Sequence, residues 1–151
     1  MGIFDLTREQ HRHAVSQRVV LAPLNFSFSV PPLLVGGLAM EYYGLRPAGS
    51  DIDLVITVED YDRLAGQYPD NLKNLWGDLG VCVHGFEIWR TIWMLDYAFL
   101  SEGAHEEAEF IVISFERLLL MRVGAMAKPK YHADLELMRG RMEEILYGKL
   151  R

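Results

Sequence analysis

The chain has one cysteine, no hydrophobic run long enough to cross a membrane, and no excess of positive charge. Cys82 has no partner for a disulfide within the chain, so we expect a buried, small hydrophobic residue in a reducing compartment. The net charge of −6 argues against indiscriminate binding to nucleic acid, which needs clustered Lys and Arg, although it leaves a local basic patch open. The N-terminus, MGIFDLTREQ, turns polar within a few residues, so we expect no signal peptide. These features predict a soluble cytoplasmic protein without a membrane partner.

Length and composition predict one folded domain over residues 1–151. Half of the residues are hydrophobic, and no low-complexity tract interrupts them. A domain of this size buries about 70% of the surface that its unfolded chain exposes. We therefore expect a single, well-formed core.

The most informative stretch is residues 33–56, LLVGGLAMEYYGLRPAGSDIDLVI. A glycine pair, Gly36-Gly37, ends a short apolar run, and a short helix is expected over residues 38–43. A Pro-Gly-Ser turn leads to two carboxylates, Asp51 and Asp53, in a predicted strand. Strand residues two apart share a face, so the two carboxylates point the same way.

Aspartate is depleted in strands, and two close carboxylates repel each other unless a cation lies between them. The flanking apolar residues place Asp51 and Asp53 where a strand enters the core. This setting favours a hard, oxygen-binding ion such as Mg2+. Gly36 and Gly37 lack Cβ atoms, so their backbone N–H groups can approach an anion at the start of the following helix. Together these features predict a site for a metal-bound polyphosphate.

This stretch resembles the nucleotidyltransferase superfamily with the DNA polymerase β-like fold, and most closely its minimal nucleotidyltransferase and AbiEii-like group. The signature is a Gly-Gly or Gly-Ser pair, about a dozen residues, and an acidic-hydrophobic-acidic triplet. Here Gly36-Gly37 is followed, after thirteen residues, by Asp51-Ile52-Asp53. A second block, VISFERLLLMRVGAMAKPKYHADLELM, is similar to the group's later helices, and the two blocks cover about a third of the chain.

The resemblance implies an α+β fold, with a small mixed sheet flanked by helices, and it implies further site residues. It places Arg46 near phosphate or the acidic site, with a surface or carboxylate-paired arginine as the alternative. Ser50 either caps its turn or contacts phosphate. Lys130 is expected near the triphosphate, although a plain surface lysine is the alternative. Asp134 either orients that lysine or begins a helix. Arg122 stands where the family usually carries a lysine.

The family also places a third carboxylate on a neighbouring strand, and two residues compete for that role. Glu87 lies inside the apolar stretch FEIW, where an unpaired charge would be costly, so we favour Glu87. Asp96 precedes a predicted helix and is more simply an N-cap. A site with no third carboxylate is the remaining alternative, and it would put catalysis in doubt.

What the resemblance implies is Mg2+- or Mn2+-dependent transfer of a nucleotidyl group from an NTP, with ATP expected, to an acceptor hydroxyl. Asp51 and Asp53 would hold the metal, and Glu87 would complete a second metal site or act as base. The acceptor would be a partner protein, RNA such as tRNA, or a small molecule, in a toxin-antitoxin type of system. A homo-oligomer would supply surface that so short a chain lacks. The alternative is a catalytically silent member of the fold that binds nucleotide or a partner.

Several local patterns predict secondary structure elsewhere. We expect helices over residues 7–21, with Thr7 capping, and over residues 59–67, 115–127 and 131–147. Ser114 is expected to cap the third of these. A further helical turn is expected over residues 71–76, and strands over 80–84 and 86–94. The acidic residues in HEEAE, 105–109, and Glu41 are expected to face solvent, whereas Tyr42 and Tyr43 are expected in the core, with base stacking as the alternative.

Overall fold

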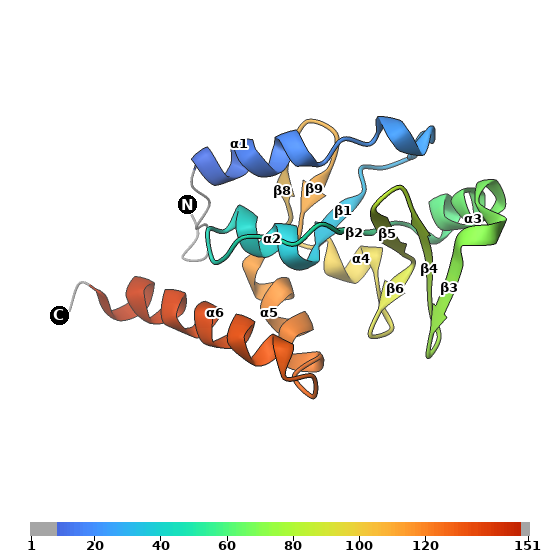
Figure 1. Ribbon diagram of the computed structural model, residues 1–151. Coiled ribbons are helices and arrows are strands. Elements are labelled where there is room, and N and C mark those ends of the chain that lie inside the picture. Colours follow the sequence, from blue (N-terminus) through green and yellow to red (C-terminus); the bar gives the residue numbers. More distant parts are fainter. Residues whose placement is uncertain (1–8, 149–151) are drawn as a thin grey trace.

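The computed structural model describes residues 9–148, and its centre is a mixed β-sheet (Figure 1). Its strands are β1 (Leu33–Val35), β2 (Ile52–Val55), β3 (Leu72–Leu75), β4 (Asp78–Val83), β5 (Phe86–Trp89), β8 (His105–Glu106) and β9 (Ile111–Val112). Their order across the sheet is β3-β4-β5-β2-β1-β9-β8. The described residues therefore have the predicted α+β fold, a mixed sheet flanked by helices.

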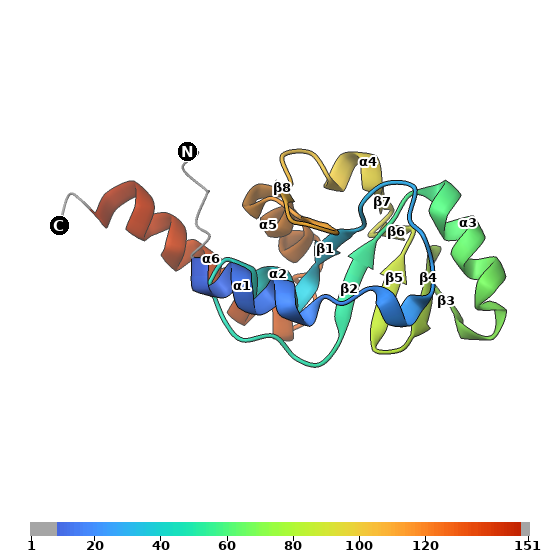
Figure 2. The same ribbon diagram turned by 90° about the horizontal axis from the view of Figure 1, so that it is seen from above.

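The helices are α1 (Glu9–Arg18), α2 (Gly36–Tyr42), α3 (Val58–Gln67), α4 (Tyr97–Leu100), α5 (Phe115–Gly124) and α6 (Lys130–Tyr147), with short 3-10 turns at Ala22–Leu24 and Pro69–Asn71. Helix α1 packs on α2, which packs on β1 and β2, and α5 packs on α6. Figures 1 and 2 show α1 on one side of the sheet, α5 and α6 on the opposite side, and α3 beside β3 and β4. The helices thus enclose the central strands.

The central strands explain why the core forms here. Strand β1 pairs antiparallel with β2 and parallel with β9, and β2 pairs parallel with β5. Leu33 and Leu34 of β1, Leu54 of β2 and Ile88 of β5 are fully buried. Because strand side chains alternate between faces, the residues that precede Leu54 and Ile88 point to the opposite face of the sheet, where polar groups can lie.

Side-chain caps fix where three helices begin. Thr57 accepts a hydrogen bond from the backbone N–H of Asp60, Asp96 from that of Phe99, and Ser114 from that of Arg117. The capping prediction for Ser114 is confirmed, and so is the N-cap interpretation of Asp96. The Thr7 prediction lies outside the described residues.

The prediction of a helical turn over residues 71–76 was wrong, because only Asn71 belongs to a 3-10 turn. Leu72–Leu75 form strand β3, which pairs antiparallel with β4. The reason is the turn beyond it, where Trp76 and Gly77 both have positive φ and the side chain of Asn74 accepts a hydrogen bond from the Gly77 N–H. Such a turn joins two antiparallel strands, and the nearby polar residues hid this hairpin in the sequence.

A second, two-stranded hairpin ties the sheet to α5. It consists of β6 (Thr91–Ile92) and β7 (Leu95–Asp96). Its turn is held by the Asp78 carboxylate, which accepts hydrogen bonds from the N–H groups of Trp93 and Met94. The Trp93 ring lies directly over Gly124, where any Cβ atom would collide with it. This contact fixes the end of α5 next to the sheet.

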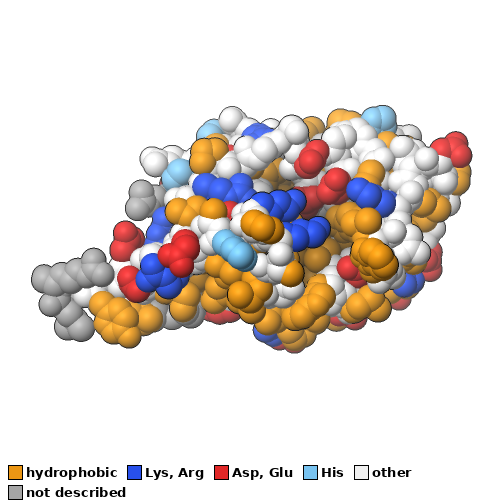
Figure 3. Space-filling model, turned by 60° about the horizontal axis from the view of Figure 1, so that its bottom comes forward, with side chains coloured by type: hydrophobic (Ala, Val, Ile, Leu, Met, Phe, Trp, Pro, Cys, Tyr) orange, Lys and Arg blue, Asp and Glu red, His pale blue; other side chains and the backbone are white. Residues whose placement is uncertain are grey.

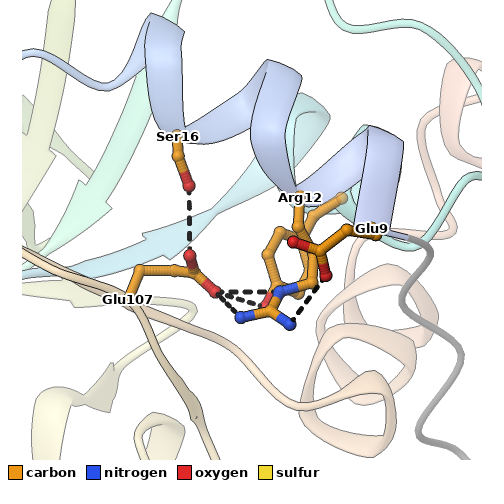
Figure 4. Close-up of polar contacts among 5 residues, drawn as sticks. Glu9, Arg12, Ser16 and Glu107 are labelled. Atoms are coloured by element: carbon orange, nitrogen blue, oxygen red, sulfur yellow. Dashed lines mark hydrogen bonds and ion pairs between the residues drawn. The ribbon is translucent and has the colours of Figure 1, made fainter.

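Two acidic side chains expected in solvent instead accept hydrogen bonds within the fold, and Figure 4 shows the contacts of one of them, Glu107. Glu107 accepts hydrogen bonds from Arg12 and Ser16 of α1 and from the hydroxyl of Tyr42. Glu41 accepts one from the Ala48 N–H. Glu106 and Glu109 are exposed as expected, but the prediction was wrong for Glu107 and Glu41, because backbone and side-chain donors satisfy these carboxylates.

Tyr42 and Tyr43 belong to the core, as expected. Their exposed fractions are 1% and 0%, and the Tyr43 hydroxyl donates to the Ile113 carbonyl oxygen. Burial and the Glu107 carboxylate raise the pKa of Tyr42 well above its ordinary value. Neither ring is open to a stacking base in this structure.

Within residues 9–148 we find no helix with the length and hydrophobicity needed to span a bilayer.

Candidate active site

Strand pairing brings the expected acidic residues together. In the parallel pair of β2 and β5, Asp53 lies directly opposite Glu87. Both side chains are half-buried, whereas Asp51, just before β2, is exposed. Because residues opposite each other in a sheet project to the same face, Asp53 and Glu87 form a carboxylate pair. The residue favoured as the third carboxylate is thus the one beside Asp53, while Asp96 caps α4.

Gly36 is in close contact with this pair. It has a φ of +70°, and a Cβ atom placed on it would lie 2.2 Å from Oδ2 of Asp53. The antiparallel pairing of β1 with β2 produces this contact, because Val35, the residue before Gly36, lies opposite Asp53. Only glycine combines this backbone conformation with room for the carboxylate. The glycine pair therefore begins α2 beside the acidic residues.

The pair's environment changes its acidity. Burial, a hydrogen bond with Glu87, and the negative charges of Glu87 and Asp51 raise the pKa of Asp53 from its ordinary 3.8 to about 7, and the positive charge of Arg122 opposes this. A carboxyl group with this pKa exchanges its proton near neutral pH. The repulsion that raises the pKa is also the repulsion that a bound cation would relieve.

This shift gives a pH-dependent prediction. Because the folded pKa of Asp53 is above its unfolded value, its contribution to stability is greatest at low pH and is lost as pH rises from about 4 to about 7. We expect Asp53→Asn to remove that part of the pH dependence, measured by urea unfolding across this range. Glu59→Gln, on the exposed first turn of α3, is the matched control. Equal pH profiles for Asp53→Asn and the native chain would contradict the coupling.

Two arginines and one buried aspartate flank the acidic pair. Arg46 donates to Asp134 from Nε, at 2.6 Å from Oδ1, and from Nη2, at 3.0 Å from Oδ2. A Cβ atom on Gly37 would lie 3.6 Å from the Arg46 guanidinium, so this arginine is also next to the glycine pair. Arg46 is therefore the carboxylate-paired arginine of the alternative interpretation, and it still borders the expected phosphate position.

Arg122 enters the same cluster from α5. It is 5% exposed, and its Nε lies 2.9 Å from Oδ2 of Asp134. The two groups form a buried ion pair. Burial opposes ionisation of Asp134, but the hydrogen bond from Arg46 and the charges of both arginines outweigh it and lower the pKa. Asp134 therefore carries a negative charge that holds two cations.

This arrangement corrects both interpretations of Asp134. Helix α6 begins at Lys130, so Asp134 does not begin it, and its partners are arginines rather than a lysine. Planar guanidinium groups can share one carboxylate in a way that an ammonium group cannot, which is the physical reason for the difference.

The remaining expected residues lie at the edge of the cluster. The Lys130 ammonium is 4.9 Å from the centre of the Tyr131 ring, and the Arg122 guanidinium is 4.8 Å from the same ring. Lys130 and Ser50 are exposed. Neither side chain contacts the acidic pair directly, so a role for them requires a ligand that extends outward from it.

Cys82 is half-buried rather than buried, because its side of the sheet is the polar one. It lies opposite Glu87 in the pairing of β4 with β5. Burial and the neighbouring carboxylates raise the pKa of its thiol. The thiol is therefore a wall of the candidate site and not an activated nucleophile.

Figure 3 shows acidic side chains in the middle of one face of the molecule, with basic side chains on both sides of them. Among residues 9–148, no three His, Cys, Asp or Glu side chains are grouped closely enough to hold a metal ion as they stand. The Asp53–Glu87 pair supplies oxygen ligands, which is the chemistry that Mg2+ prefers, and Asp51 would have to turn inward to join them.

Comparisons with known protein families, with curated proteins and with solved structures find no match for this chain. The resemblance described above therefore stays an expectation drawn from its motifs.

Sequence reasoning missed the double pairing of Asp134. A signal was present, since Arg122 interrupts the apolar helix LLLMRVGAM, and a buried arginine needs a carboxylate partner. The sequence offers several acidic residues that could serve. Only the packing of α5 against α6 selects Asp134.

Proposed function

We propose that this protein is a nucleotidyltransferase that uses Mg2+ to transfer a nucleoside monophosphate group from an NTP, such as ATP, to an acceptor hydroxyl, with release of pyrophosphate. The observation that carries the proposal is the register of β2 and β5, which pairs Asp53 with Glu87. Gly36 lies beside this pair, at a position where any other residue would collide with Asp53. Paired carboxylates next to a glycine-started helix suit a metal-bound polyphosphate.

In this proposal, Asp53 and Glu87 hold the metal, with Asp51 completing the ligand set after a side-chain rotation. The bound ion would neutralise charge that develops on the phosphate oxygens. In the alternative in which Glu87 does not bind the metal, Glu87 would take the proton of the acceptor hydroxyl as its oxygen attacks the α-phosphorus and the bond to pyrophosphate breaks.

The cations suit the leaving group. Arg46 is beside Gly37, and the Arg122 charge is close enough to lower the pKa of Asp53. Guanidinium groups bind phosphate well. Lys130, exposed beyond Tyr131, would reach the outer end of a triphosphate. Acceptors in this proposal are a partner protein, tRNA or a small molecule.

The proposal is tested by calorimetric titration of ATP and the other NTPs with and without Mg2+. We expect Mg2+-dependent binding to the native chain and at least a tenfold loss of affinity in Asp51→Asn/Asp53→Asn, because each carboxylate lost removes a charged ligand. The control is the exposed Asp62→Asn, which should bind as the native chain does. Asp60 is unsuitable as a control, because it is buried and accepts hydrogen bonds from the Ser29 N–H and Arg63.

A second candidate is a catalytically silent protein that uses the same face to bind nucleotide or a partner. The observation favouring it is that Asp134 already neutralises Arg46 and Arg122. This candidate predicts that Mg2+ makes no difference to NTP affinity, or that no NTP binds. Either result in the same titration would reject nucleotidyl transfer.

A further inference from the structure

An apolar groove lies between α5 and α6, away from the acidic pair. It has a volume of about 400 Å3, and it is lined by Leu119 of α5 and, from α6, by Leu135, Glu136, Arg139, Met142, Glu143, Leu146 and Tyr147. These α6 residues share one helix face because they recur at intervals of three and four. Leu146 and Tyr147 are 44% and 54% exposed.

The far half of α6 extends beyond the rest of the fold. Figures 1 and 2 both show the helix leaving the vicinity of α5 and continuing away from the sheet. The face from Leu135 to Tyr147 is about 18 Å long at the helical rise per residue. Its near end is a groove beside Leu119, and its far end is an exposed apolar ridge formed by Leu146 and Tyr147.

We propose that α6 is a dimerisation helix, and that a second copy of this chain lays its own α6 antiparallel in this groove. The positions on the face are almost symmetric about residue 141. Reflection about that position exchanges Leu135 with Tyr147, Glu136 with Leu146, and Arg139 with Glu143. A surface that maps onto itself in this way is what a two-fold interface requires.

The exchange is also complementary in shape and in charge. The exposed ridge of one copy, Leu146 and Tyr147, is placed over the groove end of the other at Leu135. Arg139 of each copy faces Glu143 of the other, so two ion pairs form across the axis, and no like charges are opposed. Within one copy Arg139 already pairs with Glu143, at 2.5 Å, and with Glu136, at 2.8 Å. These pairs leave the face nearly neutral, which suits an apolar contact between identical chains.

Gly140 lies next to the axis and carries no side chain, and nothing lies within 4 Å of the position that a Cβ atom would take. Reflection about residue 141 places Gly140 opposite Met142 of the second copy. A flexible methionine opposite a glycine allows two helices to approach closely. The inference is independent of nucleotidyl transfer, because the face shares no residue with the acidic site.

Light scattering after size-exclusion chromatography tests the dimer. We expect the native chain to have twice the monomer mass of 17.3 kDa. Arg139→Glu and Glu143→Arg should each weaken dimerisation at least tenfold, and the double variant Arg139→Glu/Glu143→Arg should restore it. Helical content by circular dichroism should be the same in all four proteins. A native chain that stays monomeric at every concentration would overturn the proposal.

Disulfide trapping tests whether this face of α6 contacts its own copy near residue 141. In a Cys82→Ser background, Met142→Cys is expected to form a disulfide-linked dimer under mild oxidation at least ten times faster than Leu137→Cys. Leu137 is 40% exposed on α6 but does not line the groove, so it is the matched control. Equal rates for the two cysteines would reject this face as the dimer contact. A monomer that dimerises only after deletion of residues 1–8 would identify that segment, and not a second copy, as the occupant.

Discussion

Gly36→Ala is expected to destabilise the protein by about 2–5 kcal/mol and to abolish Mg2+-dependent NTP binding. An alanine at φ +70° costs about 1–2 kcal/mol of backbone strain. Its Cβ atom, 2.2 Å from Oδ2 of Asp53, must also displace that carboxylate, and overpacking of this kind costs about 1–3 kcal/mol. Urea unfolding measures the first effect, and calorimetric titration with Mg2+ and ATP measures the second.

The neighbouring glycine provides a matched control. Gly37 lies inside α2, and the atoms nearest to a Cβ there are 3.6–3.8 Å away, which is ordinary contact distance. Gly37→Ala is expected to leave stability unchanged or to raise it by up to about 1 kcal/mol, because alanine favours helix. If both variants behaved alike, the contact between Gly36 and Asp53 would have no special importance. If Gly36→Ala lost less free energy of unfolding than expected but still lost NTP binding, the displacement of Asp53 would be its main effect.

Asp134→Ala is expected to cost about 3–5 kcal/mol of stability, because it leaves Arg122 buried without a carboxylate partner. The contribution from Arg46 is smaller, since a third of that side chain is exposed. Glu136→Ala removes an ion pair to Arg139 on the exposed face of the same helix. That control should change stability far less than Asp134→Ala, so urea unfolding of the two variants separates a buried cluster from a surface pair.

The same variant changes the acid sensitivity of the fold. Because the folded pKa of Asp134 is lowered, its stabilising effect is complete above the unfolded value, about 3.9, and is lost as pH falls through the folded value. Asp134→Ala should therefore show less loss of stability than the native chain as the pH is lowered in this acidic range. A double variant, Arg122→Met/Asp134→Leu, should recover much of the lost stability, because it leaves no buried charge unpaired. Continued instability of that variant would show that packing, and not charge, was the cause.

Local patterns predicted much of the helical structure. The caps at Ser114 and Asp96 and the helix before Gln67 depend on residues close in sequence, so the sequence contains their cause. The hairpin at residues 72–83 was missed because its turn depends on positive φ at Trp76, a residue that rarely adopts it. Nothing in the local composition around Trp76 signals this conformation.

Some residues of the candidate site could likewise be predicted from local sequence, and others could not. The motif from Gly36 to Asp53 and the apolar setting of Glu87 were enough to nominate the acidic pair, because period-two alternation and the cost of an isolated charge are local arguments. The partners of Glu107 and Asp134 were not predictable. Their donors come from α1, α2, the turn at Arg46 and α5, segments that no local rule relates to them.

The sequence by itself determined the caps at Ser114 and Asp96, and it singled out Gly36-Gly37, Asp51, Asp53 and Glu87 as candidates for one site. Tertiary structure alone decided that Asp53 faces Glu87, that Gly36 lies against Asp53, and that Arg46 and Arg122 share Asp134. The physical reason is the distance along the chain over which each interaction acts. Caps and alternation act over a few residues, whereas strand register and the pairing of buried charges are settled by the free energy of packing the whole chain.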